Sequence, residues 1–229
     1  ITVGTMLALN DINPHVFQDG SLWIPESGNG KNDLLDEIKF ELDWMRTMQD
    51  DDGGVFHKLT TKRFEGFVMP VEAVNDRYII GKSTAATLDF AANMAMASRL
   101  YKEFDPVFAE TCLASAVNAW SWAKNNPEAY YAKNPEDIHT GAYNDVILDE
   151  EFFWAAAELY ISTGEEIYYD SIKDHLSGME FRVEESWRNY VDNIGYYSLL
   201  TPKSPLEETE KNIIKDRLVS LADSLTDVI

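Results

Sequence analysis

Carboxylates and aromatic rings are the side chains in this sequence best suited to chemistry. Asp and Glu number 40 against 19 Lys and Arg, so many carboxylate pairs exist and a pair alone specifies no acid–base site. The 4 histidines are scattered along the chain, and neither they nor the 1 cysteine have the paired spacing of zinc ligands. Cys112 lies in an apolar helical pattern, where a small buried side chain is expected rather than a nucleophile. We therefore expect neither a zinc site nor a catalytic triad in this chain.

The net charge of −21 restricts the class of partner. Nucleic acid and anionic membrane surfaces both require clustered Lys and Arg, so neither is expected as a partner. A neutral polymer, a small molecule or a divalent cation fits the charge, although acidic surfaces also serve solubility alone. No apolar run is long enough to span a membrane, and no signal peptide is present.

Aromatic residues are abundant, with 6 Trp and 11 Tyr in 229 residues. Several lie in polar segments, including Tyr130, Tyr131 and Tyr143 in a long loop over residues 127–149, and Trp187 in a second polar segment. Long loops are where binding residues usually collect. Rings in such places can form sugar-stacking surfaces, and packing of the loops is the alternative.

Helical periodicity dominates the segments that must position these residues. The pattern predicts a strand over 55–60 and an irregular loop over 64–82. Helices are expected over residues 32–49, 83–104, 106–124, 150–163 and 165–178, then a weaker one after 193 and a last one from 205. Helix, long loop, helix and short turn alternate, which indicates an all-α array of hairpins closed into a toroid. We interpret residues 1–229 as one domain.

Five blocks in the chain follow one another in a familiar order. The first is Ile24-Pro25-Glu26-Ser27-Gly28-Asn29-Gly30-Lys31-Asn32-Asp33-Leu34-Leu35-Asp36-Glu37, and the others occupy residues 53–60, 67–70, 83–92 and 140–160. Their sequences and spacing resemble the family 9 glycoside hydrolases, the cellulases and endoglucanases with an inverting mechanism. The resemblance implies an incomplete portion of an (α/α)6 barrel, a β-1,4-glucan substrate and a secreted or cell-surface enzyme.

Inverting hydrolysis needs one carboxylate base and one protonated carboxylic acid. In the family the base lies in an Asp-Ala-Gly-Asp motif, shortly before the segment that matches Ile1, and the acid is a Glu near the end of the catalytic domain. Neither motif occurs here, so the resemblance assigns no catalytic residue, and this chain alone is expected to be inactive. A catalytically inactive glucan-binding or structural fragment, or another (α/α) toroid hydrolase, are the alternative interpretations.

The resemblance also implies ligand-binding residues. The expected sugar contacts are Trp187, Tyr143, His139 and Tyr131. Family members can hold a structural calcium ion in the corresponding loop, and the expected oxygen ligands are Thr140, Gly141, Asp145, Glu150 and Glu151. Acids that complement a helix dipole are the alternative explanation for the last two residues.

An incomplete toroid exposes apolar helix faces at its two ends. The faces expected to meet water carry Met6, Leu7 and Leu9 at one end, and Leu218, Leu221 and Leu225 at the other. Missing parts of the barrel, or self-association, are the expected partners of these faces.

Overall fold

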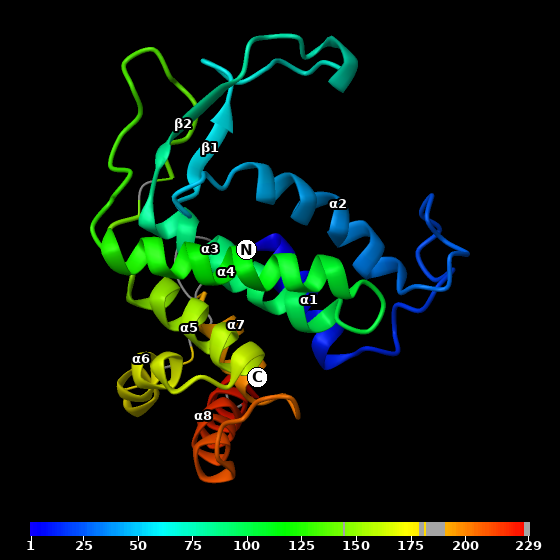
Figure 1. The fold of residues 1–229 in the computed structure, drawn as a ribbon, viewed down its shortest axis with the longest axis vertical. Helices are drawn as coiled ribbons and strands as arrows, with labels where there is room; N and C mark the ends of the chain where they lie inside the picture. The colour runs from blue at the N-terminus through cyan, green and yellow to red at the C-terminus, as the bar shows by residue number, and fades with distance from the viewer. Residues whose placement is uncertain (144, 179–180, 182–190, 227–229) are drawn as a thin grey trace.

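The computed structural model describes residues 1–143, 145–178, 181 and 191–226. These residues contain eight α-helices, one short 3-10 helix (Pro70–Glu72) and a two-stranded antiparallel sheet. The helices are α1 (Thr2–Ile12), α2 (Asp33–Thr47), α3 (Thr84–Leu100), α4 (Pro106–Asn125), α5 (Asp149–Thr163), α6 (Glu166–Ser177), α7 (Asp192–Leu199) and α8 (Glu208–Thr226), and the strands are β1 (Phe56–Thr60) and β2 (Tyr78–Lys82). The expected all-α class is confirmed, with this small sheet as an addition (Figure 1).

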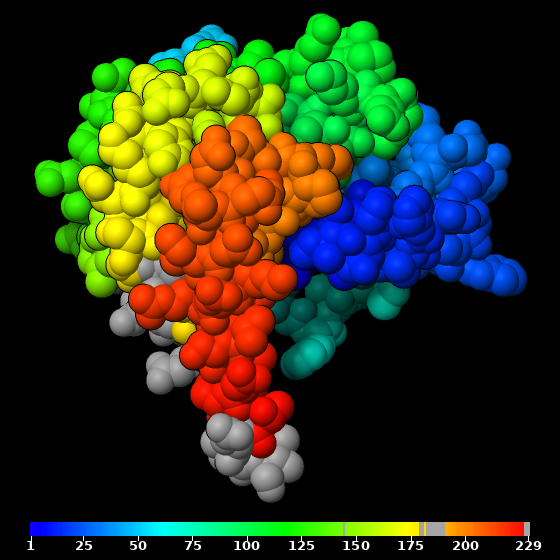
Figure 2. All heavy atoms as spheres, turned by 90° about the horizontal axis from the view of Figure 1, so that it is seen from below, coloured from blue at the N-terminus to red at the C-terminus, as the bar shows by residue number. Residues whose placement is uncertain are grey.

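The helices form an inner and an outer layer. Helices α1, α3, α5 and α7 contact one another, while α2 packs on α1, α4 on α3 and α6 on α5. Buried alanines on α3 and α5 let the inner helices approach closely. Helix α8 stands out from the body, and Ile214 is its one buried residue within the described part (Figure 2). No described helix is long and apolar enough to cross a membrane.

A buried charge network ties the inner helices together. The Arg99 guanidinium on α3 reaches Glu158 of α5 (Nη2–Oε2, 2.5 Å) and Asp11 of α1 (Nε–Oδ2, 3.4 Å). Trp154 donates its indole N–H to the other Glu158 oxygen at 3.0 Å, and Lys203 reaches Asp11 from the surface side. Three inner helices are therefore joined by the buried charges of Asp11, Arg99 and Glu158.

The block at residues 24–37 folds as a hydrogen-bonded loop that leads into α2. Asn32 caps the helix by accepting the Leu35 N–H. Asp33 is fully buried and accepts hydrogen bonds from the Leu22 and Gly20 N–H groups and from the Ser27 hydroxyl. The first-turn position of Asp33 suggests a solvent-facing charge, but its carboxylate is the internal anchor of the loop.

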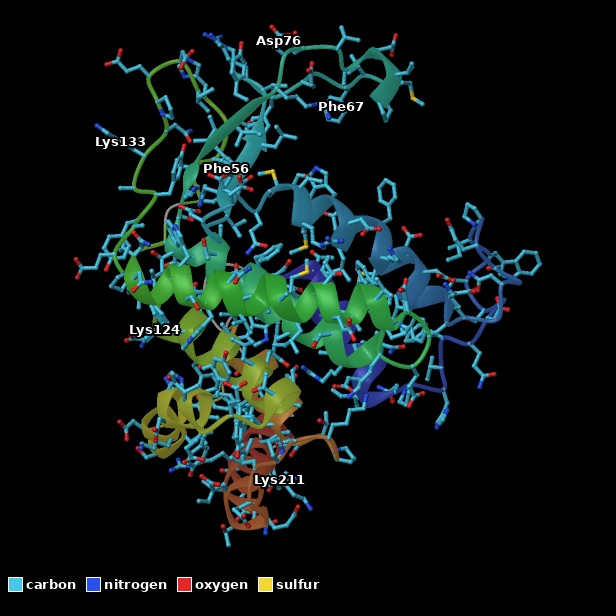
Figure 3. The ribbon with its side chains drawn as sticks, viewed as in Figure 1. Phe56, Phe67, Asp76, Lys124, Lys133 and Lys211 are labelled. Carbon is cyan, nitrogen blue, oxygen red and sulfur yellow. The ribbon has the colours of Figure 1, made fainter. Side chains whose placement is uncertain are left out.

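The prediction of an irregular loop over residues 64–82 is wrong at its end. Tyr78–Lys82 forms β2, which pairs with β1 in an arm that projects from the helices (Figure 1). Figure 3 shows Phe67 and Asp76 in the outer part of this arm. Its exposed apolar residues include Phe64, Phe67, Val68, Met69, Val71 and Val74.

The expected exposure of the two end faces is correct only in part. Leu9 and Leu225 are exposed, but Leu7 is fully buried. The reason is that α1 lies between α3 and α7, so one of its faces is covered by inner helices. Met6, Leu218 and Leu221 are half-buried.

Candidate functional site at the loop end of the helices

The site is built where long connections enter the inner helices. The β1–β2 arm leads into the N-terminus of α3, and the loop over residues 126–148 leads into α5 (Figure 1). Helix N-termini carry unpaired N–H groups and partial positive charge, so polar side chains collect there. The arm and the 126–148 loop contact each other through a set of side-chain hydrogen bonds.

His57 of β1 is held on three sides. Its ring stacks on Tyr131 with 4.1 Å between centroids and 16° between planes. Its Nε2 lies 2.9 Å from the Ala142 carbonyl oxygen, and its Nδ1 lies 2.9 Å from the Ser83 hydroxyl, which also accepts the Ala86 N–H. A carbonyl only accepts, so Nε2 carries the proton and Nδ1 accepts from Ser83. Burial lowers the pKa of His57, and neighbouring Lys58 lowers it further, so a neutral ring results at pH 7.

Lys58 is enclosed by neutral oxygen atoms. Its ammonium donates to the Gly141 carbonyl (2.6 Å), the Asn134 side-chain oxygen (2.8 Å) and the Thr140 hydroxyl (3.2 Å). The Tyr131 ring faces the same ammonium, 5.7 Å away. Desolvation lowers the pKa of Lys58. The ammonium thus acts as a tethered cation that joins β1 to the loop.

Buried carboxyl groups lie at the start of α5. Glu151 is only 4% exposed, and its pKa is raised to about 9 by burial and by the carboxylates of Asp89 and Asp145. Within the described residues, Glu151 Oε2 and Asp89 Oδ1 are buried without a hydrogen-bond partner. Burial and the neighbouring carboxylates therefore favour the protonated, neutral form of Glu151.

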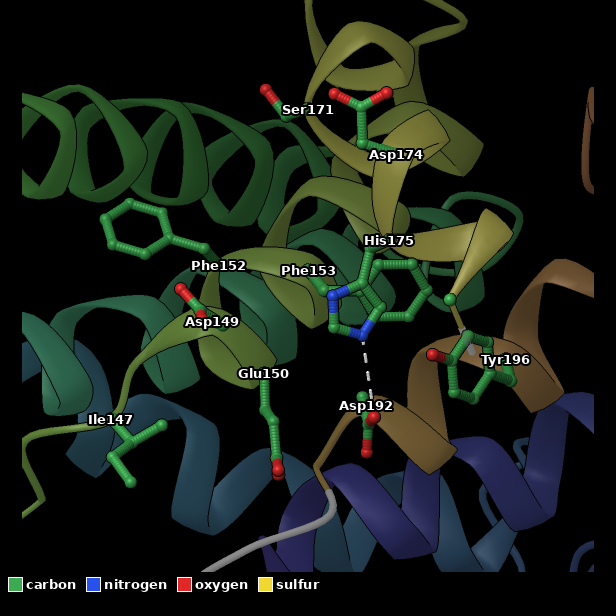
Figure 4. Close-up of a pocket in the computed structure, with 11 residues that line it drawn as sticks. Ile147, Asp149, Glu150, Phe152, Phe153, Ser171, Asp174, His175, Asp192 and Tyr196 are labelled. Carbon is green, nitrogen blue, oxygen red and sulfur yellow. Dashed lines mark ion pairs between the residues drawn. The ribbon is translucent and has the colours of Figure 1, made fainter. Parts of the chain in front are cut away.

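A cavity of about 630 Å³ opens beside this cluster, between α5, α6 and α7 (Figure 4). Glu150 and Asp192 line it together with His175, whose Nε2 lies 3.6 Å from Asp192 Oδ2. The His175 ring stacks on Phe153 at 4.4 Å. The cavity offers carboxylates and one imidazole to a polar ligand.

Two of the four predicted sugar contacts, Tyr131 and His139, differ in their access to solvent. Tyr131 is only 9% exposed, because its ring is covered by His57, and its hydroxyl donates to Asn134. His139 is exposed, and its backbone N–H donates to the Lys62 carbonyl at 2.7 Å. Tyr131 supports the loop, while His139 is open to a ligand.

The remaining two predicted contacts are Tyr143 and Trp187. Tyr143 is half exposed and has a positive φ of 55°. Its ring lies over Gly141, where an added Cβ would come within 2.8 Å of the ring and would displace the tyrosine side chain. Trp187 lies outside the described residues, and its role stays a prediction.

The five predicted calcium ligands do not form one coordination group. Thr140 and Gly141 direct their oxygens at the Lys58 ammonium, and a bound cation would be repelled there. The half-buried Asp145 lies close enough to the buried Glu151 to raise its pKa, while Glu150 lines the cavity. Among the described residues, no three His, Cys, Asp or Glu side chains are placed to hold a metal ion. Calcium binding therefore stays a prediction.

Some residues of the site carry no motif of their own. Asn134 gains its role from the Lys58 ammonium, 76 residues earlier in the chain, and Asp89 gains its role from the effect of its charge on Glu151. His57 and Lys58 are adjacent in the block over residues 53–60. The resemblance of that block to the family is the sequence signal that could have pointed to them.

Comparison with known proteins agrees with this architecture. The family model described as glycosyl hydrolase family 9 matches residues 1–226. A xyloglucan-specific endo-β-1,4-glucanase of Bacteroides ovatus is 42% identical over 98% of this chain and 40% of its own length. Endoglucanase D of Acetivibrio thermocellus is 36% identical over 98% of this chain and 36% of its own length. A solved structure described as Bacteroides ovatus GH9 superimposes with a TM-score of 0.89 at 41% identity, covering 99% of this chain and 43% of that chain.

Paired inner and outer helices with polar loops at one end define a protein of the (α/α)6-barrel class, and the solved structure with which the chain superimposes is assigned to this class. The chain belongs to glycosyl hydrolase family 9. It spans about two fifths of the length of the curated relatives that it matches.

Proposed function

We propose that this chain forms part of a glycoside hydrolase that cleaves β-1,4-glucan with inversion, and that the loop end of its helices binds the glucan. The observation that carries the proposal is the family match over residues 1–226, together with relatives named as endoglucanases. The Bacteroides ovatus relative is named for xyloglucan, which makes xyloglucan a suitable first probe. A secreted or cell-surface location belongs to the same proposal.

In this proposal His57, Tyr131 and Lys58 contribute to glucan binding by holding the loop rigid. The His57–Tyr131 stack and the Lys58 ammonium fix the segment over residues 139–143 to β1 before any ligand arrives. A preorganised loop loses less entropy on binding than a mobile one. The exposed His139 and Tyr143 then meet the sugar, with a ring face and polar atoms already in position.

In this proposal, hydrolysis of the glycosidic bond requires catalytic carboxyl groups from another part of the enzyme. An inverting pair needs carboxyl groups roughly 6.5–9.5 Å apart on either side of the bond. Since the family's Asp-Ala-Gly-Asp motif does not occur in residues 1–229, we expect this chain alone to release no reducing sugar from carboxymethylcellulose or xyloglucan. Hydrolysis by the purified chain would place the catalytic acids within it and contradict this assignment.

Tyr143→Asn tests the binding role. Asn tolerates the left-handed backbone of this position, so the loop is kept while the ring is lost. We expect affinity for soluble xyloglucan to fall about 2- to 10-fold, the equivalent of ~0.5–1.5 kcal/mol of ring contact. Affinity electrophoresis measures it. Phe40→Ala, which removes an exposed ring from the outer helix α2, is the control and should bind as the wild type does. Unchanged binding of the Tyr143 variant would remove the loop end as the glucan site.

A further inference from the structure

Trp23 lies on the loop that joins α1 to α2, and its exposed fraction is 92%. Its φ of 59° places it in the left-handed region, and Tyr143 is the other non-glycine residue with positive φ among those described. A bulky residue is disfavoured in this region. An indole this exposed gains little packing in return, so the fold of the chain does not explain why Trp occupies this position.

The backbone on both sides of Trp23 is fixed by side chains. Leu22 donates its N–H to Asp33 Oδ2 at 2.8 Å, and Ile24 donates its N–H to Ser27 Oγ at 3.1 Å. The Ser27 hydroxyl in turn donates to Asp33 Oδ2 at 2.9 Å. Since the Asp33 carboxylate is fully buried, these bonds anchor the loop to the start of α2 and hold the indole out in solvent. Strain that the surroundings maintain is a feature of binding sites.

From this geometry we propose that Trp23 is a stacking platform for a neutral β-glucan chain, at a second site apart from the loop end described above. The indole offers a flat apolar face to the C–H groups of a pyranose ring and one N–H donor to a hydroxyl group. A net charge of −21 disfavours anionic ligands. The choice of glucan as the ligand rests on the proposed function.

The platform and the loop-end site are far apart in the molecule. The loop with Trp23 follows the C-terminus of α1, whereas the β1–β2 arm and the 126–148 loop precede the N-termini of α3 and α5. Figure 1 shows the two regions at opposite ends of the helical body. One long polysaccharide could thus be held at two places, which raises its effective concentration at each.

The test is affinity electrophoresis of the 229-residue chain in gels that contain soluble xyloglucan or hydroxyethylcellulose. We expect Trp23→Ala to weaken binding about 2- to 10-fold, and Phe40→Ala, which removes an exposed ring on relaxed helical backbone, to leave it unchanged. Trp23→Gly should weaken binding equally but raise Tm by ~2–4 °C, because glycine relieves the left-handed backbone.

Two results would overturn the platform: a Trp23→Ala variant that binds as tightly as the wild type, or a Trp23→Gly variant with a lower Tm, which would show a structural role. Weaker binding by Tyr143→Asn but not by Trp23→Ala would contradict the Trp23 site and would remain consistent with the proposed function. The reverse pattern would sink the loop-end site alone. A wild-type chain that neither glucan retards would contradict both.

Discussion

Arg99→Met lowers the free energy of unfolding by about 3–5 kcal/mol, the usual cost of removing one partner from a buried ion pair. The Arg99 side chain is 8% exposed, and its partners Glu158 and Asp11 are 0% and 1% exposed. Methionine fills much of the volume but supplies no charge and no donor. Burial already raises the pKa of Glu158, and Arg99 is the main group that opposes this shift. Without Arg99 the buried carboxyl group must therefore take up a proton.

Urea denaturation followed by circular dichroism measures the effect. Lys203→Met is the matched control, because Lys203 contacts the same Asp11 carboxylate with a side chain that is half exposed. Lys203 is only half buried and Asp11 keeps Arg99 as a partner, so the control should lose clearly less stability than Arg99→Met. A loss below 1 kcal/mol for Arg99→Met would contradict the view that this network holds α1, α3 and α5 together.

A double variant separates the charge from the shape. Arg99→Met with Glu158→Gln removes both charges and keeps an oxygen to accept the Trp154 N–H. Replacing a buried pair by neutral groups is often close to neutral in stability. The double variant should therefore recover most of what Arg99→Met loses. A failure to recover would locate the cost in packing rather than in the unpaired carboxyl group.

The helices were predictable because their boundaries are set by nearby residues. Ser83 caps α3 by accepting the Ala86 N–H, and Pro106 follows the Asp105 cap of α4. Gly164 ends α5 in the left-handed conformation. Each signal lies within a few residues of the boundary that it sets, so it can be recognised in the sequence alone.

Elements that depend on distant partners were less accessible. The strand β2 forms because its residues pair with β1, for example Tyr78 with Thr60, and no pattern within residues 78–82 identifies that partner. Leu7 is buried by inner helices that follow much later in the chain. Asp33 has the local features of a surface charge, and its burial results from a loop that folds back over it.

The candidate site shows the same division. The sequence indicates Thr140 and Gly141 as oxygen ligands for a cation, because hydroxyl and carbonyl groups in a loop suit one. The cation that the structure places there is the Lys58 ammonium, from a strand about eighty residues earlier. The contact between β1 and this loop is not encoded in the local sequence. Only the structure shows that a lysine side chain already donates hydrogen bonds to these oxygen atoms.

Glu151→Gln raises stability at pH 8 by a few kcal/mol and removes a slope from the pH dependence of stability. The folded-state pKa of Glu151 is about 9, against an ordinary value of 4.5. Between these two values the folded chain holds a proton that the unfolded chain releases, so the wild type loses stability as pH rises from about 4.5 to about 9. Below 4.5 both states hold the proton, and the slope from this group vanishes. Gln is neutral at every pH and has nearly the same shape, so the variant does not lose stability as the pH rises through this range.

Melting curves at pH 5, 6, 7 and 8 in chelator test this expectation, with Glu150→Gln as the control. Glu150 is the neighbouring acid, but it is half-buried and lines the cavity, so its variant should keep the wild-type slope. Repeating the series with calcium extends the test, because a divalent cation at Glu151 would replace the proton and stabilise the wild type most at pH 8. Equal melting with calcium and with chelator would count against the predicted calcium ion. A wild type whose stability does not fall between pH 5 and 8 would show that Glu151 is ionised in the folded chain, and that a cation or another donor compensates its charge.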